Sequence, residues 1–185
     1  MTRWEPNARG RLQLAALELY SERGYDQVTV AEIARHAGLT ERTYFRYFAD
    51  KREVLFYGSS MLQDRIVQGI ADAAAGLPPL GAVGAALESA AEVIPGRELA
   101  GRRQAIVKAN PELLERELIK LATLASAIAS ALRGRGVPDH AASLAAEAGV
   151  AVFKVAFERW VSGDADQPLA PVIRQSMVEL KSVTA

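Results

Sequence analysis

Apolar residues recur at spacings of three and four along almost the whole chain, a pattern that predicts amphipathic helices. The first predicted helix runs from about Asn7 to Arg23 and stops at Gly24, a residue suited to a left-handed C-cap. Its apolar face consists of Leu12, Ala15, Ala16 and Leu19. Runs of β-branched residues as long as a strand are scarce, so the predicted fold class is all-α.

A short second helix is predicted between Thr29 and Gly38. Thr29 is a good N-cap, and Glu32 stands three residues later, where it completes a capping box. The helix should therefore cover residues 30–36.

Two more helices are predicted within the first third of the chain. Thr40 can cap a third helix that ends near Phe48, and Asp50 can cap a fourth helix from about Lys51 to Ala75. Glycine and proline then delimit five further helices, near residues 80–93, 97–109, 111–133, 138–161 and 169–182. About nine helices result, which we divide into an N-terminal domain of residues 1–52 and a larger C-terminal domain of residues 53–185.

The second and third helices, joined by Ala37-Gly38-Leu39, have the form of a helix-turn-helix, in which the second helix can enter a DNA major groove. At 100° per residue, Tyr44 and Phe48 fall on one side of the third helix, which can be buried. The opposite arc contains Arg42, Thr43, Arg46 and Tyr47. Its arginines can donate two hydrogen bonds to guanine or bind phosphate, and Phe45, between the arcs, can touch a thymine methyl group. A solvated surface face is the ordinary alternative for such a helix.

The stretch from Ala15 to Leu55 also resembles the DNA-binding head of the TetR family of bacterial transcriptional regulators. The resemblance rests on the segments ALELYSERGY, TVAEIARHAGLT and ERTYFRYFADKREVL. It implies DNA contacts at Thr29, Thr40, Arg42, Thr43, Phe45, Arg46, Tyr47 and Lys51. Phe45 stands where most members have tyrosine, so the phosphate hydrogen bond of that hydroxyl is lost. Further candidates for contact with the DNA backbone or minor groove are Arg3, Arg9 and Arg11.

Composition narrows the function classes only slightly. The 22 basic and 22 acidic residues cancel, so net charge predicts no partner. The chain has no cysteine and only two histidines, and no glycine-rich phosphate loop follows a strand. We therefore expect no enzyme, no cofactor and no metal site. Because polar residues interrupt the apolar stretches, we expect no membrane span and a cytoplasmic location.

For the larger domain, the family resemblance implies a helical cage for a small molecule and dimerisation through the last two long helices. A stripe of mostly small residues suits the dimer interface, with core packing as the alternative: Ala145, Ala148, Gly149, Val152, Ala156 and Trp160. Candidate effector-pocket residues, again with core packing as the alternative, are Phe56, Met61, Leu62, Gln104, Lys108, Leu121, Leu124, Phe153 and Phe157. The segment from Arg102 to Glu117 resembles a C-terminal domain type of actinobacterial regulators, some of which look responsive to acyl-CoA.

The leading hypothesis is a repressor that binds a palindromic double-stranded operator as a homodimer and is released by an unidentified, largely apolar small molecule. In this hypothesis the fourth helix, Lys51 to Ala75, is a lever that changes the separation of the two DNA-binding heads. One alternative is a helix-turn-helix regulator without a small-molecule effector. Another is an all-helical lipid-binding module or enzyme with a vestigial head.

Overall fold

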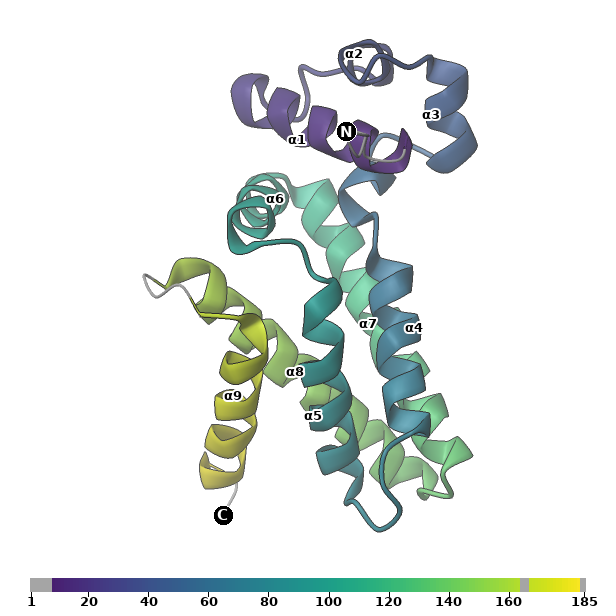
Figure 1. Ribbon diagram of the computed structural model, residues 1–185, viewed down its shortest axis with the longest axis vertical. Helices are drawn as coiled ribbons and strands as arrows, with labels where there is room; N and C mark the ends of the chain where they lie inside the picture. Colours follow the sequence, from purple (N-terminus) through teal and green to yellow (C-terminus); the bar gives the residue numbers. More distant parts are fainter. Residues whose placement is uncertain (1–7, 164–166, 184–185) are drawn as a thin grey trace, which may run out of the picture. The chain divides into compact units, whose positions relative to one another are not determined.

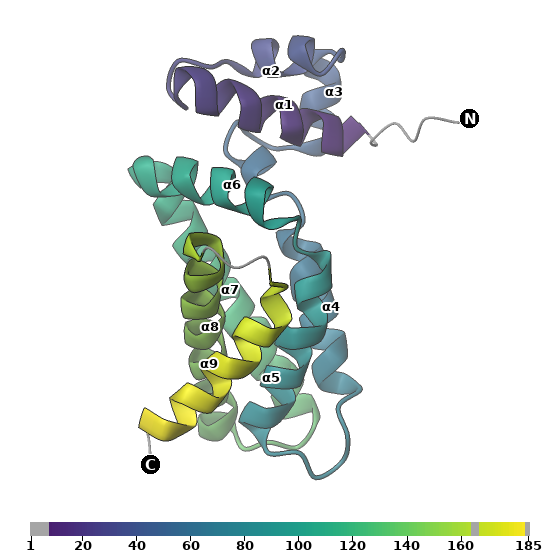
Figure 2. The same ribbon diagram turned by 60° about the vertical axis from the view of Figure 1, so that its left-hand side comes forward.

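The computed structural model of the chain describes residues 8–163 and 167–183 (Figures 1 and 2). Within these residues the chain is helical without strands, which confirms the predicted all-α class. The α-helices are α1 (Ala8–Arg23), α2 (Val30–His36), α3 (Glu41–Tyr47), α4 (Ser59–Ala71), α5 (Pro79–Ala90), α6 (Arg97–Ala109), α7 (Pro111–Gly134), α8 (Asp139–Ser162) and α9 (Leu169–Val183). Two short 3₁₀ helices are η1 (Glu53–Phe56) and η2 (Ala91–Val93). Arg3 and Asn7, named above, lie outside the described residues.

The chain forms two compact units. The first comprises the N-terminal segment as far as Tyr57 together with residues 102–117, and the second comprises residues 58–101 and the chain from Leu118 onward. Helices α6 and α7 therefore each contribute residues to both units. This grouping adds residues 53–57 and 102–117 to the N-terminal helices, and a domain boundary at residue 52 stays a prediction.

The turn between α2 and α3 in the first unit is a Schellman motif. Gly38 has φ +66°, its backbone N–H donates to the Arg35 carbonyl, and the Leu39 N–H donates to the Ala34 carbonyl. The Arg11 guanidinium of α1 donates to the Ala37 carbonyl, so α1 supports the turn directly. A side chain at position 38 would meet both a left-handed backbone and Arg11, because an added Cβ would lie 2.8 Å from Nη2.

The prediction of one continuous fourth helix from Lys51 to Ala75 is wrong. The Asp50 carboxylate accepts hydrogen bonds from the backbone N–H groups of Arg52 and Glu53 and starts the 3₁₀ helix η1. Gly58 then has φ +94°, which no α-helical residue adopts, so η1 and α4 are separate elements. A helical periodicity of apolar residues continues across this break, and for this reason the sequence pattern did not reveal it.

In the second unit, α5 packs against α4, α8 and α9. Glycine permits two close approaches: an added Cβ at Gly149 would lie 2.3 Å from Val83 Cγ1, and one at Gly84 would lie 2.8 Å from the Met177 side chain. The apolar core of this unit also draws Leu124, Ile128 and Leu132 from α7. These two glycines thus allow α8 and α9 to pack closely against α5.

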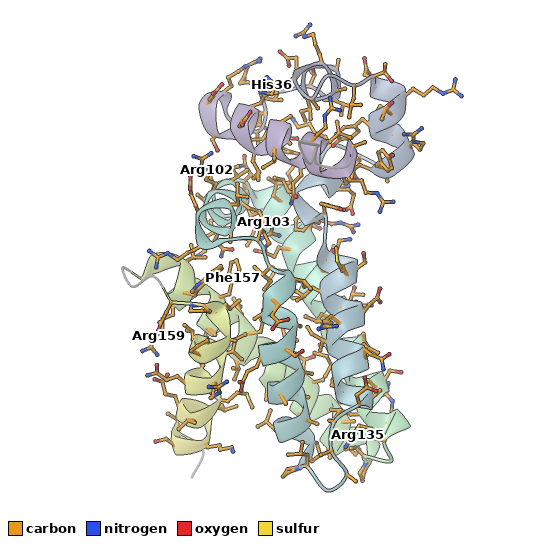
Figure 3. The ribbon with its side chains drawn as sticks, viewed as in Figure 1. His36, Arg102, Arg103, Arg135, Phe157 and Arg159 are labelled. Carbon is orange, nitrogen blue, oxygen red and sulfur yellow. The ribbon has the colours of Figure 1, made fainter. Side chains whose placement is uncertain are left out.

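Arg135, between α7 and α8, caps the carboxyl end of α4 (Figure 3). Its guanidinium donates to the Ile70 carbonyl in the last turn of α4 and to the Ala73 and Ala74 carbonyls just beyond it. A cation at this end also interacts favourably with the helix dipole. The α7–α8 connection and the α4–α5 connection are therefore held together within the second unit.

By length and composition alone, one described helix, α8, could cross a membrane. This is weak evidence, because a core helix of a soluble protein passes the same test. Val152, Phe153 and Trp160 of α8 lie in the apolar core of the second unit.

We expect the α2 capping box to give the protein a dependence on acid. The Glu32 carboxylate accepts hydrogen bonds from the Thr29 backbone N–H and hydroxyl and pairs with Arg23. These groups lower the pKa of Glu32 to about 2, and the Thr29 backbone N–H makes the largest contribution. A carboxyl with a lowered pKa stabilises the fold above its unfolded-state pKa and loses this effect as pH falls toward the folded-state value.

The melting temperature of the wild type should therefore fall between about pH 4.5 and pH 2, partly through Glu32. In Glu32→Gln this part of the fall should disappear, as measured by circular dichroism. Glu22→Gln, on the exposed surface of α1, is the matched control. Identical acid limbs for Glu32→Gln and the wild type would contradict the linkage.

Candidate nucleic-acid interface

Helix α3 has one buried aromatic face and one exposed basic face. Tyr44 is fully buried and Phe48 nearly so, whereas Arg42 and Arg46 are exposed. Phe45 is 53% exposed, with its ring edge-on to Tyr44 at a centroid distance of 5.6 Å. An aromatic side chain this exposed is available to an apolar group such as a thymine methyl.

The threonines assigned to DNA contact already cap helices. Thr40 Oγ1 accepts from the Thr43 backbone N–H and lies 3.0 Å from Thr43 Oγ1. Thr29 Oγ1 accepts from the Glu32 N–H and donates to the Glu32 carboxylate. Both caps leave Thr40 and Thr29 exposed to solvent, and their DNA contacts stay predictions.

The arginines of this surface differ from several other arginines of the first unit in their partners. Among the described residues no carboxylate pairs with Arg9, Arg42 or Arg46. Other arginines of the same unit do have acidic partners: Arg23 with Glu32, Arg52 with Asp50, Arg103 with Glu117 and Arg116 with Glu53. Positive charge without counter-charge on a helix-turn-helix suits phosphate and the acceptor-rich edge of guanine.

Lys51 is anchored in the first unit. Its Nζ donates to the Tyr25 carbonyl at 2.6 Å and lies 4.0 Å from the centroid of the Tyr25 ring. Partial burial lowers the pKa of this ammonium group. Since at least one of its three donors is used inside the protein, Lys51 stabilises the loop before α2, and its assigned phosphate contact remains a prediction.

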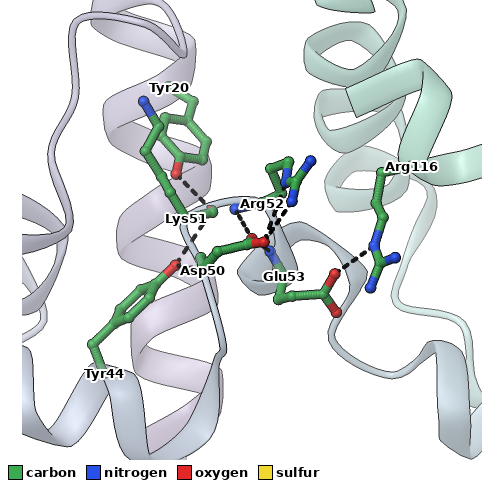
Figure 4. Close-up of polar contacts among 7 residues, drawn as sticks. All are labelled: Tyr20, Tyr44, Asp50, Lys51, Arg52, Glu53 and Arg116. Carbon is green, nitrogen blue, oxygen red and sulfur yellow. Dashed lines mark hydrogen bonds and ion pairs between the residues drawn. The ribbon is translucent and has the colours of Figure 1, made fainter. Parts of the chain in front are cut away.

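The link from α3 to η1 is held by buried tyrosines (Figure 4). Tyr44 Oη donates toward the Asp50 and Lys51 carbonyls at 3.2 and 3.3 Å, and Tyr20 Oη of α1 donates to the Lys51 carbonyl at 3.2 Å. Burial raises the pKa of both phenols, so they stay protonated and act as donors. The carboxyl end of α3 is therefore tied to α1, because Tyr44 and Tyr20 both bind the Lys51 carbonyl.

Residues 102–117 are joined to η1 by two arginines. Arg103 Nε donates to the Leu55 carbonyl at 2.8 Å, its Nη1 pairs with Glu117 at 2.7 Å, and its guanidinium lies 5.0 Å from the Phe56 ring centroid. Arg116 Nε pairs with Glu53 at 2.6 Å (Figure 4). These side chains are more than two-thirds buried, so solvent screens the pairs less than exposed ones.

The candidate effector-pocket residues fall into both units. Phe56, Gln104 and Lys108 belong to the first unit, and Phe56 is covered by Arg103. In the second unit, Leu62, Leu121 and Phe157 pack against the apolar core that contains Leu124 and Phe153, whereas Met61 is 49% exposed. Only the five core-associated residues are brought together, and their role in ligand binding stays a prediction.

Five of the six residues in the small-residue stripe predicted for the dimer interface face the inside of this chain. Of its six residues, Ala145, Gly149, Val152, Ala156 and Trp160 are buried without any second copy, and Ala148 is half-buried. Gly149 faces Val83 of α5, and Trp160 Nε1 donates to the Gln167 carbonyl. Periodicity identifies an apolar face but cannot tell whether its partner lies in the same chain, and here the partner is α5.

Sequence reasoning missed Arg103, Arg116 and Arg135, which all bind backbone or side chains more than a dozen residues away. Nothing in their local sequence distinguishes them from solvated arginines. It also left open whether Arg11 reaches DNA, and the structure places Arg11 against the Ala37 carbonyl.

The geometry as a whole defines a DNA-binding protein of the helix-turn-helix class. Two comparisons by sequence model agree: residues 14–57 match the model described as bacterial regulatory proteins, tetR family, and residues 77–185 match the MftR C-terminal domain. The second match spans more than half of the chain. The chain therefore belongs to the TetR family of transcriptional regulators.

Individual relatives are more distant. The transcriptional regulator TcmR of Streptomyces glaucescens is 33% identical over 108 residues, an alignment that spans 58% of this chain and 48% of TcmR. A TetR-family structure from Mesorhizobium loti has 20% identity and a TM-score of 0.61, with 96% of each chain covered. The regulator FadR of Bacillus subtilis, solved with stearoyl-CoA, has 20% identity and a TM-score of 0.59, with 92% of this chain and 96% of FadR covered. At this identity the two structures show a common fold.

The Arg116–Glu53 pair should measurably stabilise η1. Glu53→Gln and Arg116→Gln should each speed amide hydrogen exchange at residues 54–56 by about 5- to 30-fold, as expected for the loss of about 1–2 kcal/mol from a charged, partly buried hydrogen bond. The double variant should exchange little faster than either single variant, because both remove the same bond. Arg159→Gln, which breaks an exposed pair with Glu179, is the control and should leave residues 54–56 unchanged. Fully additive effects of the two substitutions would argue against a direct pair.

Proposed function

We propose that the protein is a repressor that binds a palindromic operator as a homodimer and releases it when a largely apolar small molecule binds the second unit. The observation that carries the DNA-binding part is the exposed α3 face, where Arg42 and Arg46 lack carboxylate partners among the described residues. One such helix reads only a few base pairs, and two copies about 34–36 Å apart can engage successive major grooves. A homodimer on a palindromic site follows from this requirement.

We place the proposed dimer interface on the outer face of α8 and α9. Leu144 and Val155 of α8 are 73% and 58% exposed, and Val178 of α9 is 62% exposed. Leu144, Ala148, Ala151 and Val155 follow one another at spacings of four, three and four, so they share one face of the helix. Large apolar side chains at such exposure favour burial against a second copy.

An acyl-CoA is the proposed class of effector. The second unit contains an apolar cluster in which Phe153 and Phe157 lie 6.1 Å apart and Phe157 and Trp160 lie 5.7 Å apart. Phe157, labelled in Figure 3, is half-buried, so the core covers only part of its side chain. Surroundings of this kind suit a hydrocarbon chain. The stearoyl-CoA complex of FadR, a protein of the same fold, supports the choice of probe.

The proposed signal between effector and DNA passes through α6 and α7. Both helices begin or end in the second unit and contribute residues 102–117 to the first, where Arg103 and Arg116 bind η1. Helix α4, part of the lever that the sequence predicts, is separated from η1 by Gly58. A displacement of α6 or α7 would therefore reach η1 through ion pairs and hydrogen bonds, and then α3 through the Asp50–Lys51 link.

The proposed function is tested by selecting genomic DNA fragments with the purified protein and titrating the bound fragment with stearoyl-CoA. We expect a palindromic site whose affinity falls steeply with salt, because phosphate contacts release counterions. Saturating stearoyl-CoA should weaken operator binding by at least tenfold, and the operator should weaken stearoyl-CoA binding by the same factor. No preferred fragment would disprove sequence-specific binding. Operator affinity unchanged by bound stearoyl-CoA would disprove acyl-CoA release while leaving DNA binding intact.

The outer face of α8 should control assembly. Leu144→Arg and Val155→Arg should each convert the dimer to a folded monomer, because an unpaired charge cannot be buried in the interface without a large cost. Gly149→Arg should instead lower the melting temperature sharply, because Val83 occupies the space. Sedimentation velocity at micromolar concentration, combined with circular dichroism, separates the two results. A wild-type monomer, or a dimer insensitive to both outer substitutions, would refute this interface.

A further inference from the structure

Arg9, at the start of α1, shares an aromatic ring with the recognition helix. Its Cζ lies 5.1 Å from the centroid of the Tyr47 ring, and the Cζ of Arg46 lies 4.8 Å from the same centroid. Arg46 Nη2 also donates to Tyr47 Oη at 3.0 Å. Residues 37 positions apart in the sequence therefore place two guanidinium groups around one phenol ring.

Two positive charges at one ring repel each other, and among the described residues no carboxylate forms an ion pair with Arg9 or Arg46. The ring quadrupole of Tyr47 attracts each guanidinium, but at an exposed site this attraction is weak. The next arginine of α1, Arg11, is turned inward to the Ala37 carbonyl and does not join the cluster. An anion held between Arg9 and Arg46 would remove the repulsion and accept hydrogen bonds from guanidinium groups that have no carboxylate partner among the described residues.

We propose that Arg9, Tyr47 and Arg46 form a binding site for one phosphodiester of the DNA backbone. The proposal rests on the proposed operator binding and deepens it by assigning roles to the arginines. Tyr47 is the positioning residue, because its ring and hydroxyl hold Arg46 at the carboxyl end of α3. Arg9 and Arg46 contact the backbone, and Arg42, in the first turn of α3, reads base edges.

Position along α3 supports this division of roles. In helix-turn-helix proteins the N-terminal residues of the recognition helix contact base edges. Arg42 is the second residue of α3, whereas Arg46 is the sixth of seven and lies against Tyr47, whose ring also meets Arg9 of α1. A guanidinium that stacks on a ring keeps its outward N–H groups available, and their fork matches two phosphate oxygens.

The assignment predicts different signatures for the two kinds of arginine. In Arg9→Ala and in Arg46→Ala, affinity for the selected operator and for random duplex should fall by the same factor, about 3- to 10-fold at roughly 0.15 M salt. The slope of log affinity against log salt should become shallower by about one. In Arg42→Ala the operator should lose about 10-fold or more while random duplex changes little, so the specificity ratio falls. Arg65→Ala, an exposed arginine on α4, is the matched control and should change neither quantity.

Uncharged replacements in the DNA backbone show which phosphate Arg9 and Arg46 contact. Each operator phosphate is replaced in turn by an uncharged methylphosphonate, and binding is measured for the wild type and for Arg9→Ala. At one phosphate, the replacement should weaken DNA binding by the wild type but have little further effect on binding by Arg9→Ala. Replacement of the same phosphate should also have little effect on binding by Arg46→Ala. Arg9→Lys should retain the salt slope, because a charge remains, and lose part of the affinity, because the fork is gone.

The outcomes distinguish the proposed phosphate site from the proposed operator binding on which it rests. A wild-type protein that binds no duplex refutes the proposed function. If the wild type binds but Arg9→Ala keeps its full salt slope, or if Arg9→Ala and Arg46→Ala are sensitive to different phosphates, the shared site is refuted and operator binding stands. A fall in specificity ratio for Arg46→Ala would show that Arg46 reads a base.

Discussion

The placement of the recognition helix depends on two backbone carbonyl groups, those of Asp50 and Lys51. Tyr44 of α3 donates to both, and Tyr20 of α1 donates to the Lys51 carbonyl. A buried phenol must find an acceptor and a buried carbonyl a donor, or each costs about 1–3 kcal/mol. Few arrangements satisfy all of these groups at once, and this restricts how α1, α3 and the start of η1 can be oriented. Phenylalanine at position 44 would preserve the packing volume but leave the Asp50 carbonyl without its tyrosine donor, whereas phenylalanine at position 20 would leave the Lys51 carbonyl dependent on Tyr44.

The sequence predicted helix boundaries well where capping residues or a glycine turn mark the helix ends. The capping box of Thr29 and Glu32, the Thr40 cap and the glycine turn at Gly38 all form as expected. The buried and exposed faces of α3 also follow from its periodicity. The break at Gly58 was missed because apolar spacing continues through it. The partner of the α8 stripe was missed because a helix face carries no information about which helix covers it, and Val83 of α5 does so here.

Long-range arginine contacts could not be predicted from local pattern at all. Arg103, Arg116 and Arg135 look like surface charges in sequence, yet each binds groups at least 14 residues away. The chain thus uses arginine in two ways. In the first unit, Arg23, Arg52, Arg103 and Arg116 are paired with carboxylates and contribute to structure, whereas Arg9, Arg42 and Arg46 have no such partner among the described residues. The balance of 22 basic and 22 acidic residues conceals this division, because net charge does not record where the pairs form.

The inclusion of residues 102–117 in the first unit bears on how a regulator of this kind could respond to a ligand. A long helix running into the DNA-binding head would transmit any tilt directly, but Gly58 interrupts that path and its φ of +94° is incompatible with a helix. Helices α6 and α7, in contrast, continue without interruption from the second unit into the first. Their contacts with η1 are a carbonyl hydrogen bond, a cation–π contact and partly buried ion pairs, which are directional and short. Such contacts lose most of their energy over a shift of about 1 Å, since hydrogen bonds weaken steeply with distance and angle. In the proposed signal, a modest displacement of α6 or α7 would therefore weaken the contacts that hold η1 and, through η1, alter the Asp50–Lys51 link to α3.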